Sequence, residues 1–91
     1  MNKKELIVEI AHRTNQTQKD TEEILNSFCD IVGEELTANR KVQILGFGSF
    51  EVRNRAARKG KNPRTGEVVE IESSKAPAFK AGKALKDLVN I

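Results

Sequence analysis

The residues best suited to chemistry are six closely spaced cations within residues 53–67, a stretch that holds no large apolar side chain. They are Arg53, Arg55, Arg58, Lys59, Lys61 and Arg64. The one acid of the stretch, Glu67, stands at its far end. Guanidinium and ammonium groups neutralise phosphates, so this run predicts electrostatic binding to a polyanion that weakens as salt rises.

Charge is divided unevenly along the 91 residues. Residues 1–52 hold six basic and nine acidic residues, a net charge of −3, whereas residues 53–91 hold ten and four, a net charge of +6. A neutral or acidic body with a basic face is typical of nucleic-acid binding. The alternative is a basic surface that only keeps the protein in solution.

A turn is expected near the middle of the basic stretch, at Asn62, Pro63, Thr65 and Gly66. Turn formation could be the whole role of Pro63. A proline at the end of a basic ribbon could also act as a rigid apolar wedge. Inserted between base pairs from the minor groove, such a wedge unstacks them and bends the duplex.

Two helices are expected before the basic stretch. Apolar residues at helical spacing predict the first over residues 3–13, with Asn2 in a capping box. Thr17 marks the start of the second, and Asn15 and Asn39 suit left-handed helix ends. The apolar stripe of the second helix is wide enough to face more than one neighbour, so the isolated chain is not expected to fold stably.

Strands are expected after the helices, because the apolar period changes to two. Alternation over residues 42–44 and 50–52 predicts two antiparallel strands joined by a turn at residues 46–48. The apolar face ends at Val52, so the hairpin should leave the core there and re-enter it near Val68. At about 3.3 Å per residue its legs reach roughly 20–25 Å, about the width of a DNA duplex.

The end of the chain predicts a short edge segment at Pro77 and Phe79, and a last helix over residues 83–89 after Gly82. Three apolar residues of this helix are expected to face inward: Leu85, Leu88 and Val89. Three lysines recur every third residue and are expected to share one outer face: Lys80, Lys83 and Lys86.

Residue types that serve catalysis or metal binding are scarce. His12 is the one histidine, expected at the surface near the end of the first helix. Cys29 is the one cysteine, which excludes an intrachain disulfide and predicts a small core residue. Acids are interleaved with bases rather than paired for acid–base work. We therefore expect no enzyme, no cofactor and no metal. No signal peptide and no apolar run of about 18 residues is visible, which predicts a cytosolic protein without membrane contact.

A longer motif combines these features. Residues 46–50, Gly-Phe-Gly-Ser-Phe, are followed by Arg55, Arg58, Gly60, Asn62-Pro63 and Thr65-Gly66. This pattern resembles the signature of the bacterial HU/integration host factor family, and the resemblance covers residues 1–91. It implies an α+β fold with two N-terminal helices, a three-stranded antiparallel sheet with a long protruding hairpin arm, and a short C-terminal helix. It also implies an intertwined dimer. Residues 1–40 would then be the helical dimerisation part, and residues 41–91 the sheet, the arm at about 53–67 and the last helix.

The resemblance also implies roles for individual residues. DNA contacts by the arm are implied for Arg53, Arg55, Arg58, Lys61, Asn62, Pro63 and Arg64, and the basic Lys59 lies among them. Contacts with more distant phosphates are implied for Lys80, Lys83 and Lys86, with Lys3 as a further candidate. A shared aromatic core at the dimer interface is implied for Phe47, Phe50 and Phe79. Two arms would embrace duplex DNA and kink it with their prolines.

Residues 75–90 resemble HU more than integration host factor. HU-like proteins bind DNA with little sequence preference, favour bent, nicked or gapped duplexes and compact the nucleoid. The physics agrees, because a proline wedge carries no base code and a flexible site costs less to deform. The simpler expectation is a homodimer, with a paralogous partner as the alternative. Other functions left open are a sequence-selective DNA bender like integration host factor, an RNA-binding protein with a basic extension, and a structural dimer with an incidental basic surface.

Overall fold

Local hydrogen bonds define the first two helices. The computed structural model describes the backbone of residues 1–91 and every side chain except those of Arg58 and Ile71. Helix α1 spans Lys3–Thr14 and helix α2 spans Gln18–Thr37. Asn2 Oδ1 accepts a hydrogen bond from the Glu5 amide at 2.9 Å, so the predicted N-cap is confirmed. The chain divides into two compact units, residues 1–34 and 35–91.

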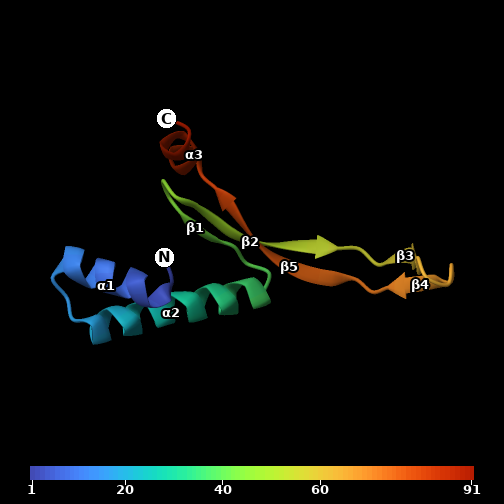
Figure 1. Ribbon diagram of the computed structural model, residues 1–91, viewed down its shortest axis with the longest axis horizontal. Coiled ribbons are helices and arrows are strands. Elements are labelled where there is room, and N and C mark those ends of the chain that lie inside the picture. Colours follow the sequence, from blue (N-terminus) through green and yellow to red (C-terminus); the bar gives the residue numbers. More distant parts are fainter. The chain divides into compact units, whose positions relative to one another are not determined.

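Helices α1 and α2 form a hairpin with a small interior (Figure 1). Asn15 takes the predicted left-handed conformation between them, with φ 55°. Ile7 and Ala11 of α1 and Thr21 of α2 are the buried residues, at 7%, 6% and 4% exposure. Lys3 Nζ donates a hydrogen bond to Asn26 Oδ1 at 2.5 Å and ties the two helices together.

Much of the apolar stripe of α2 is uncovered in the single chain. Ile24, Phe28 and Ile31 follow one another at spacings of four and three and are 66%, 37% and 53% exposed. Cys29 is also exposed, so its predicted place in the core is wrong for the isolated chain. None of the helices, whose residues are all described, is long and apolar enough to cross a membrane.

An ion pair closes the turn that follows α2. Asn39 has φ 60°, as predicted, and the Arg40 amide donates to the Glu35 carbonyl oxygen at 2.8 Å. The guanidinium of Arg40 also donates hydrogen bonds to both carboxylate oxygens of Glu35, from Nε to Oε2 at 2.8 Å and from Nη2 to Oε1 at 3.0 Å. This hydrogen bond lowers the pKa of the Glu35 carboxyl and raises the pKa of Arg40. The pair lies where the chain leaves α2 and approaches β1.

The central sheet is antiparallel and has the strand order β1-β2-β5. Its strands are β1 Val42–Ile44, β2 Gly48–Arg55 and β5 Ser74–Ala81. Side chains alternate between its faces, so Val42, Phe50 and Phe79 share one row and Gln43, Ser49 and Lys80 share the next row on the opposite face. The sheet therefore has an apolar face and a polar face.

Three aromatic rings gather on the apolar face. The ring centroid of Phe79 lies 5.2 Å from that of Phe47 and 5.1 Å from that of Phe50. These are favourable spacings for tilted aromatic pairs. Phe47 and Phe79 are each still 42% exposed, so the cluster is only partly covered by the chain itself.

Gly48 is a position where the sheet leaves no room for a side chain. A Cβ added there would lie 2.5 Å from the Lys80 carbonyl oxygen and 2.6 Å from Cζ of Phe79. We expect Gly48→Ala to lower the free energy of unfolding by about 1–3 kcal/mol, measured by urea denaturation at fixed protein concentration. Gly33→Ala is the control, because a Cβ there meets nothing within 4 Å and alanine favours the helix. Equal stability of Gly48→Ala and the unchanged protein would contradict the steric argument.

A separate two-stranded ladder forms beyond the central sheet (Figure 1). Strand β3 spans Arg58–Lys61 and strand β4 spans Val68–Ile71, with Lys61 opposite Val68 and Gly60 opposite Val69. The α+β class with a long hairpin arm is thus confirmed. The predicted return to the core near Val68 is wrong, because Val68 and Val69 are 68% and 49% exposed and pair only with this ladder.

The sheet resumes later than predicted, at β5, which is eight residues long rather than a short segment at Pro77 and Phe79. Helix α3 follows at Lys83–Val89, as predicted, and lies at the end of the sheet opposite the β3–β4 ladder (Figure 1). The Gly82 amide donates to the Phe47 carbonyl oxygen at 2.8 Å and anchors the helix start. Leu88 and Val89 are 65% and 75% exposed, so their predicted inward orientation is wrong for the single chain.

Candidate nucleic-acid interface

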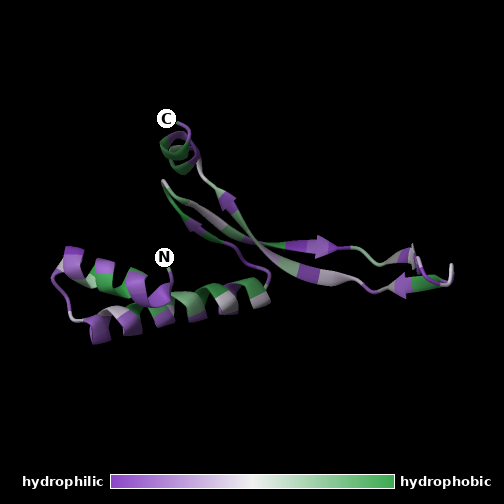
Figure 2. Ribbon diagram, in the orientation of Figure 1, coloured by the Kyte–Doolittle hydropathy of each residue, from purple (hydrophilic) through white to green (hydrophobic). Residues whose placement is uncertain are grey.

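The basic residues of the arm lie along an exposed ribbon made by the end of β2 and by β3. Arg53 and Arg55 occupy the end of β2, and Lys59 and Lys61 alternate with Gly60 in β3. All four cations are exposed. Figure 2 shows the end of β2 as strongly hydrophilic and the start of β4 as apolar. The predicted contact Arg58 belongs to β3, but its side chain lies outside the described residues.

These cations have no acidic partner within the described residues. The ion pairs of that part of the chain join Arg13 to Glu9 and Arg40 to Glu35. Lys59 stands opposite Glu70 in the β3–β4 register, yet no ion pair joins their described side chains. Cations without an internal partner keep their full charge available for a phosphate.

Hydrogen bonds shape the arm tip over residues 62–67. The Asn62 amide donates to the Glu67 carbonyl oxygen at 2.8 Å, and the Gly66 amide donates to the Asn62 carbonyl oxygen at 2.7 Å. Gly66 takes the expected left-handed conformation, with φ 76°. Pro63 is exposed at the apex of this turn. The tip therefore presents a rigid apolar ring to solvent beside basic residues.

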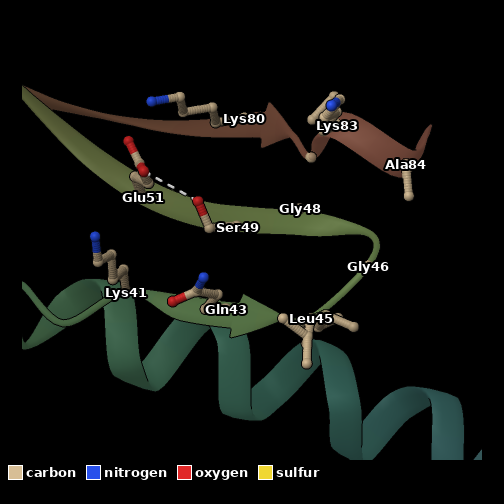
Figure 3. Close-up of a pocket in the computed structure, with 13 residues that line it drawn as sticks. Lys41, Gln43, Leu45, Gly46, Gly48, Ser49, Glu51, Lys80, Lys83 and Ala84 are labelled. Carbon is tan, nitrogen blue, oxygen red and sulfur yellow. Dashed lines mark hydrogen bonds between the residues drawn. The ribbon is translucent and has the colours of Figure 1, made fainter. Parts of the chain in front are cut away.

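A second basic group surrounds a hollow of about 440 Å³ on the polar face of the sheet (Figure 3). Lys41, directly before β1, Lys80 of β5 and Lys83 of α3 line it together with Glu51. Ser49 Oγ donates a hydrogen bond to Glu51 Oε1 at 3.0 Å, the dashed line in Figure 3. Three lysines around one carboxylate leave this hollow positively charged.

The structure separates lysines that the sequence had grouped. Lys80 belongs to strand β5, whereas Lys83 and Lys86 belong to α3, so helical spacing does not relate Lys80 to the other two. Lys83 lines the hollow with Lys80, and Lys86 does not. Lys41 does line it and was missed. Lys41 directly precedes Val42, whose side chain lies on the apolar face, so strand alternation places Lys41 on the polar face. This alternation is the sequence signal that could have identified Lys41.

Lys3 lies elsewhere, in the helical hairpin, where its ammonium bonds to Asn26. His12 is exposed in the last turn of α1, as predicted. The described residues contain no group of three or more His, Cys, Asp or Glu that could hold a metal ion. Their arrangement suits electrostatic and steric contact with a large anionic partner rather than bond chemistry.

Known proteins share this arrangement over nearly the whole chain. The family described as bacterial DNA-binding protein matches residues 1–90. The DNA-binding protein HU-1 of Halalkalibacterium halodurans is 55% identical over 89 residues, which are 98% of this chain and 99% of that protein. The chain belongs to the bacterial DNA-binding protein family. Members of this family are non-enzymatic DNA-binding proteins.

Two further relatives agree with this family membership. The DNA-binding protein HU of Lactococcus lactis is 54% identical over 88 residues, 97% of each chain. The HU chain in a structure described as an Anabaena HU–DNA cocrystal is 40% identical, with a TM-score of 0.89 over 98% of this chain and 97% of that one. The resemblance to HU seen in the sequence is thus confirmed.

Proposed function

We propose that this bacterial DNA-binding protein is a histone-like architectural protein that binds duplex DNA with little sequence preference and bends it. The observation that carries the proposal is the exposed basic ribbon, whose described cations lack acidic partners and which ends at the exposed Pro63. The family supports it, because one matched HU chain was crystallised with DNA. The merely solubilising basic surface is disfavoured, because such a surface needs no shaped tip.

Charge and shape suggest different roles for the arm cations, for the arm tip and for the lysines outside the arm. The arm cations Arg53, Arg55, Arg58, Lys59, Lys61 and Arg64 would contact phosphates from the minor groove, with Asn62 and Pro63 at the tip. Phosphate contacts supply affinity and position but no sequence information. Pro63 would enter between base pairs and replace stacking with a kink. Lys80, Lys83, Lys86 and Lys3 would meet phosphates farther along the bent duplex.

A preference for nicked, gapped or already bent DNA follows from the same mechanism. Bending a duplex and unstacking a step cost free energy, and a nick or gap lowers this cost. A sequence-selective bender would need base-edge contacts, and the wedge offers none. An RNA partner is disfavoured, because the family members matched here bear the name DNA-binding protein.

We further propose that the working unit is a homodimer in the bacterial nucleoid. Residues 1–40 would serve mainly dimerisation, and residues 41–91 would hold the sheet, the arm at about 53–67 and the last helix. Phe47, Phe50 and Phe79 would form the aromatic core of the interface, and within the chain the Phe79 ring contacts the other two. A partner chain would cover the apolar side chains that the single chain exposes.

The function is tested by fluorescence anisotropy with an intact duplex, a nicked duplex of the same sequence and a matched RNA duplex across a salt series. We expect the tightest binding to nicked DNA and an affinity that falls steeply as salt rises. Lys61→Ala should lower the slope of log affinity against log salt by about 1.8, because the proposed dimer loses one phosphate contact in each of its two arms and each contact contributes about 0.9. Lys19→Ala, on exposed helix α2, is the matched control and should leave the slope unchanged. Equal or tighter binding to RNA would overturn the proposed partner.

A further inference from the structure

The side chain of Asn62 is used inside the arm tip. Its Oδ1 accepts a hydrogen bond from the Arg64 amide at 2.9 Å, across the intervening Pro63. Its backbone amide and carbonyl make the two further bonds that close the turn, to Glu67 and Gly66. Asn62 is half-buried, although it lies at the end of an exposed ribbon. The acceptor atom of this amide is therefore engaged before any DNA arrives.

The position of this bond determines what it can hold. Proline has no backbone N–H, so it cannot donate a hydrogen bond from its own nitrogen that would fix its orientation. The Asn62 Oδ1 bond to the Arg64 amide instead closes a ring of atoms around Pro63. Asparagine side chains commonly mimic a backbone turn in this way. Thr65 Oγ1 accepts from the Glu67 amide at 3.3 Å and supports the returning strand more weakly.

Little else in the arm restricts the conformation of its tip. Its distal part is a two-stranded ladder, and such ladders are marginally stable in water. Val68 and Val69 are 68% and 49% exposed, so the described side chains of the ladder form no buried apolar interior. Without a local brace the tip would have to be ordered when DNA binds, and this would weaken binding and bending.

We propose that Asn62 is a positioning residue, whose side-chain carbonyl sets the orientation of Pro63 for insertion. This proposal rests on the proposed wedge function of Pro63. In this proposal Asn62 Oδ1 stabilises the turn at the tip by accepting from the Arg64 amide, and it does not read a base. Side chains that can accept the same hydrogen bond should therefore preserve bending, and side chains that cannot should weaken it.

Three variants test the proposal in the full-length protein. Asn62→Ala removes the acceptor, and Asn62→Ser keeps a shorter one that can form the same kind of turn. Asn54→Ala is the matched control, because Asn54 is an exposed asparagine of β2 whose side chain makes no hydrogen bond among the described residues. Each is compared by fluorescence energy transfer on an end-labelled nicked duplex, by anisotropy, and by amide hydrogen exchange of the free protein.

We expect the Arg64 amide of Asn62→Ala to exchange roughly 2- to 10-fold faster, the range expected from losing one exposed hydrogen bond. Its DNA bend should fall part of the way toward that of Pro63→Ala, while Asn62→Ser and Asn54→Ala should keep most of the bend. A normal bend in Asn62→Ala, or a loss in Asn62→Ser as large as in Asn62→Ala, would overturn the proposal. If Pro63→Ala itself bends DNA normally, the wedge function fails, and the exchange of Arg64 still decides whether Asn62 braces the tip.

Discussion

Replacing Pro63 with alanine should reduce the DNA bend far more than the affinity for DNA. The basic side chains that supply phosphate attraction remain in Pro63→Ala, and this attraction dominates affinity. Alanine removes the rigid ring that would hold two base pairs apart, and the duplex can then restack. We expect the bend angle to fall strongly on intact DNA, while the dissociation constant rises by less than about tenfold, a change under about 1.4 kcal/mol.

The chain offers a close control, because its only other proline, Pro77, lies in strand β5 of the sheet. Pro77 pairs with Val52 and is exposed, so Pro77→Ala makes the same chemical change away from the tip. Bend angles are measured by fluorescence energy transfer between the ends of one duplex at saturating protein. Equal bends for Pro63→Ala and the unchanged protein would remove the wedge role and leave a basic arm that only holds DNA.

Local structure was predictable because the residues that determine it are neighbours in sequence. Asn2 caps α1 through the amide three residues away, and Asn15 and Asn39 take left-handed conformations at helix ends. These choices depend on side-chain reach and backbone sterics, which act over a few residues. The turn at Gly66 follows the same rule. Helix ends and the arm tip were therefore accessible from the sequence.

Burial was much less predictable, because it depends on what lies across from each residue. The return of apolar alternation after the turn suggested that the hairpin re-enters the core near Val68, yet the partner strand is the polar β3 and Val68 stays exposed. Cys29, Leu88 and Val89 lie at apolar helical positions and are likewise exposed in the single chain. Periodicity identifies the apolar face of an element but not its neighbour.

The hollow on the polar face shows a further limit. Its lysines come from the residue before β1, from β5 and from α3, and its acid Glu51 comes from β2. Their proximity depends on strand order and register, in which Ser49 pairs with both Gln43 and Lys80. Spacing along the chain cannot supply that register when strands far apart in sequence pair. For this reason Lys41 was overlooked, and Lys80 was grouped with helical neighbours.

The stability of the protein should depend strongly on its concentration. The buried residues of the described chain are few, and Ile24, Phe28 and Ile31 of α2 are 66%, 37% and 53% exposed. Exposed apolar side chains at such regular spacing need a partner, and a second copy of the chain is the proposed one. If folding requires a dimer, each tenfold dilution removes about 1.4 kcal/mol of stability, and the melting temperature falls with it.

A charge placed in the apolar stripe of α2 gives the sharpest test of the dimer. Ile31→Glu should weaken association by about 10- to 100-fold or more, because the transfer free energy of isoleucine is lost and a carboxylate must be desolvated. Gln18→Glu adds the same charge to the first turn of the same helix, outside the stripe, and should leave association unchanged. Sedimentation equilibrium measures both, against the 10.1 kDa mass of one chain.

The outcomes of this test distinguish a chain that is stable as a monomer from a chain that is stable only as a dimer. A folded 10.1 kDa species at micromolar concentration, with a melting temperature independent of dilution, would mean that one chain is stable with its apolar stripe in water. The exposed residues of α2 would then require another explanation. A dimer that loses its fold in Ile31→Glu but not in Gln18→Glu would instead place the missing core between two chains. Because one chain holds a single arm, only the dimer brings two wedges to one DNA duplex, and a bend made by two kinks would then disappear with the dimer.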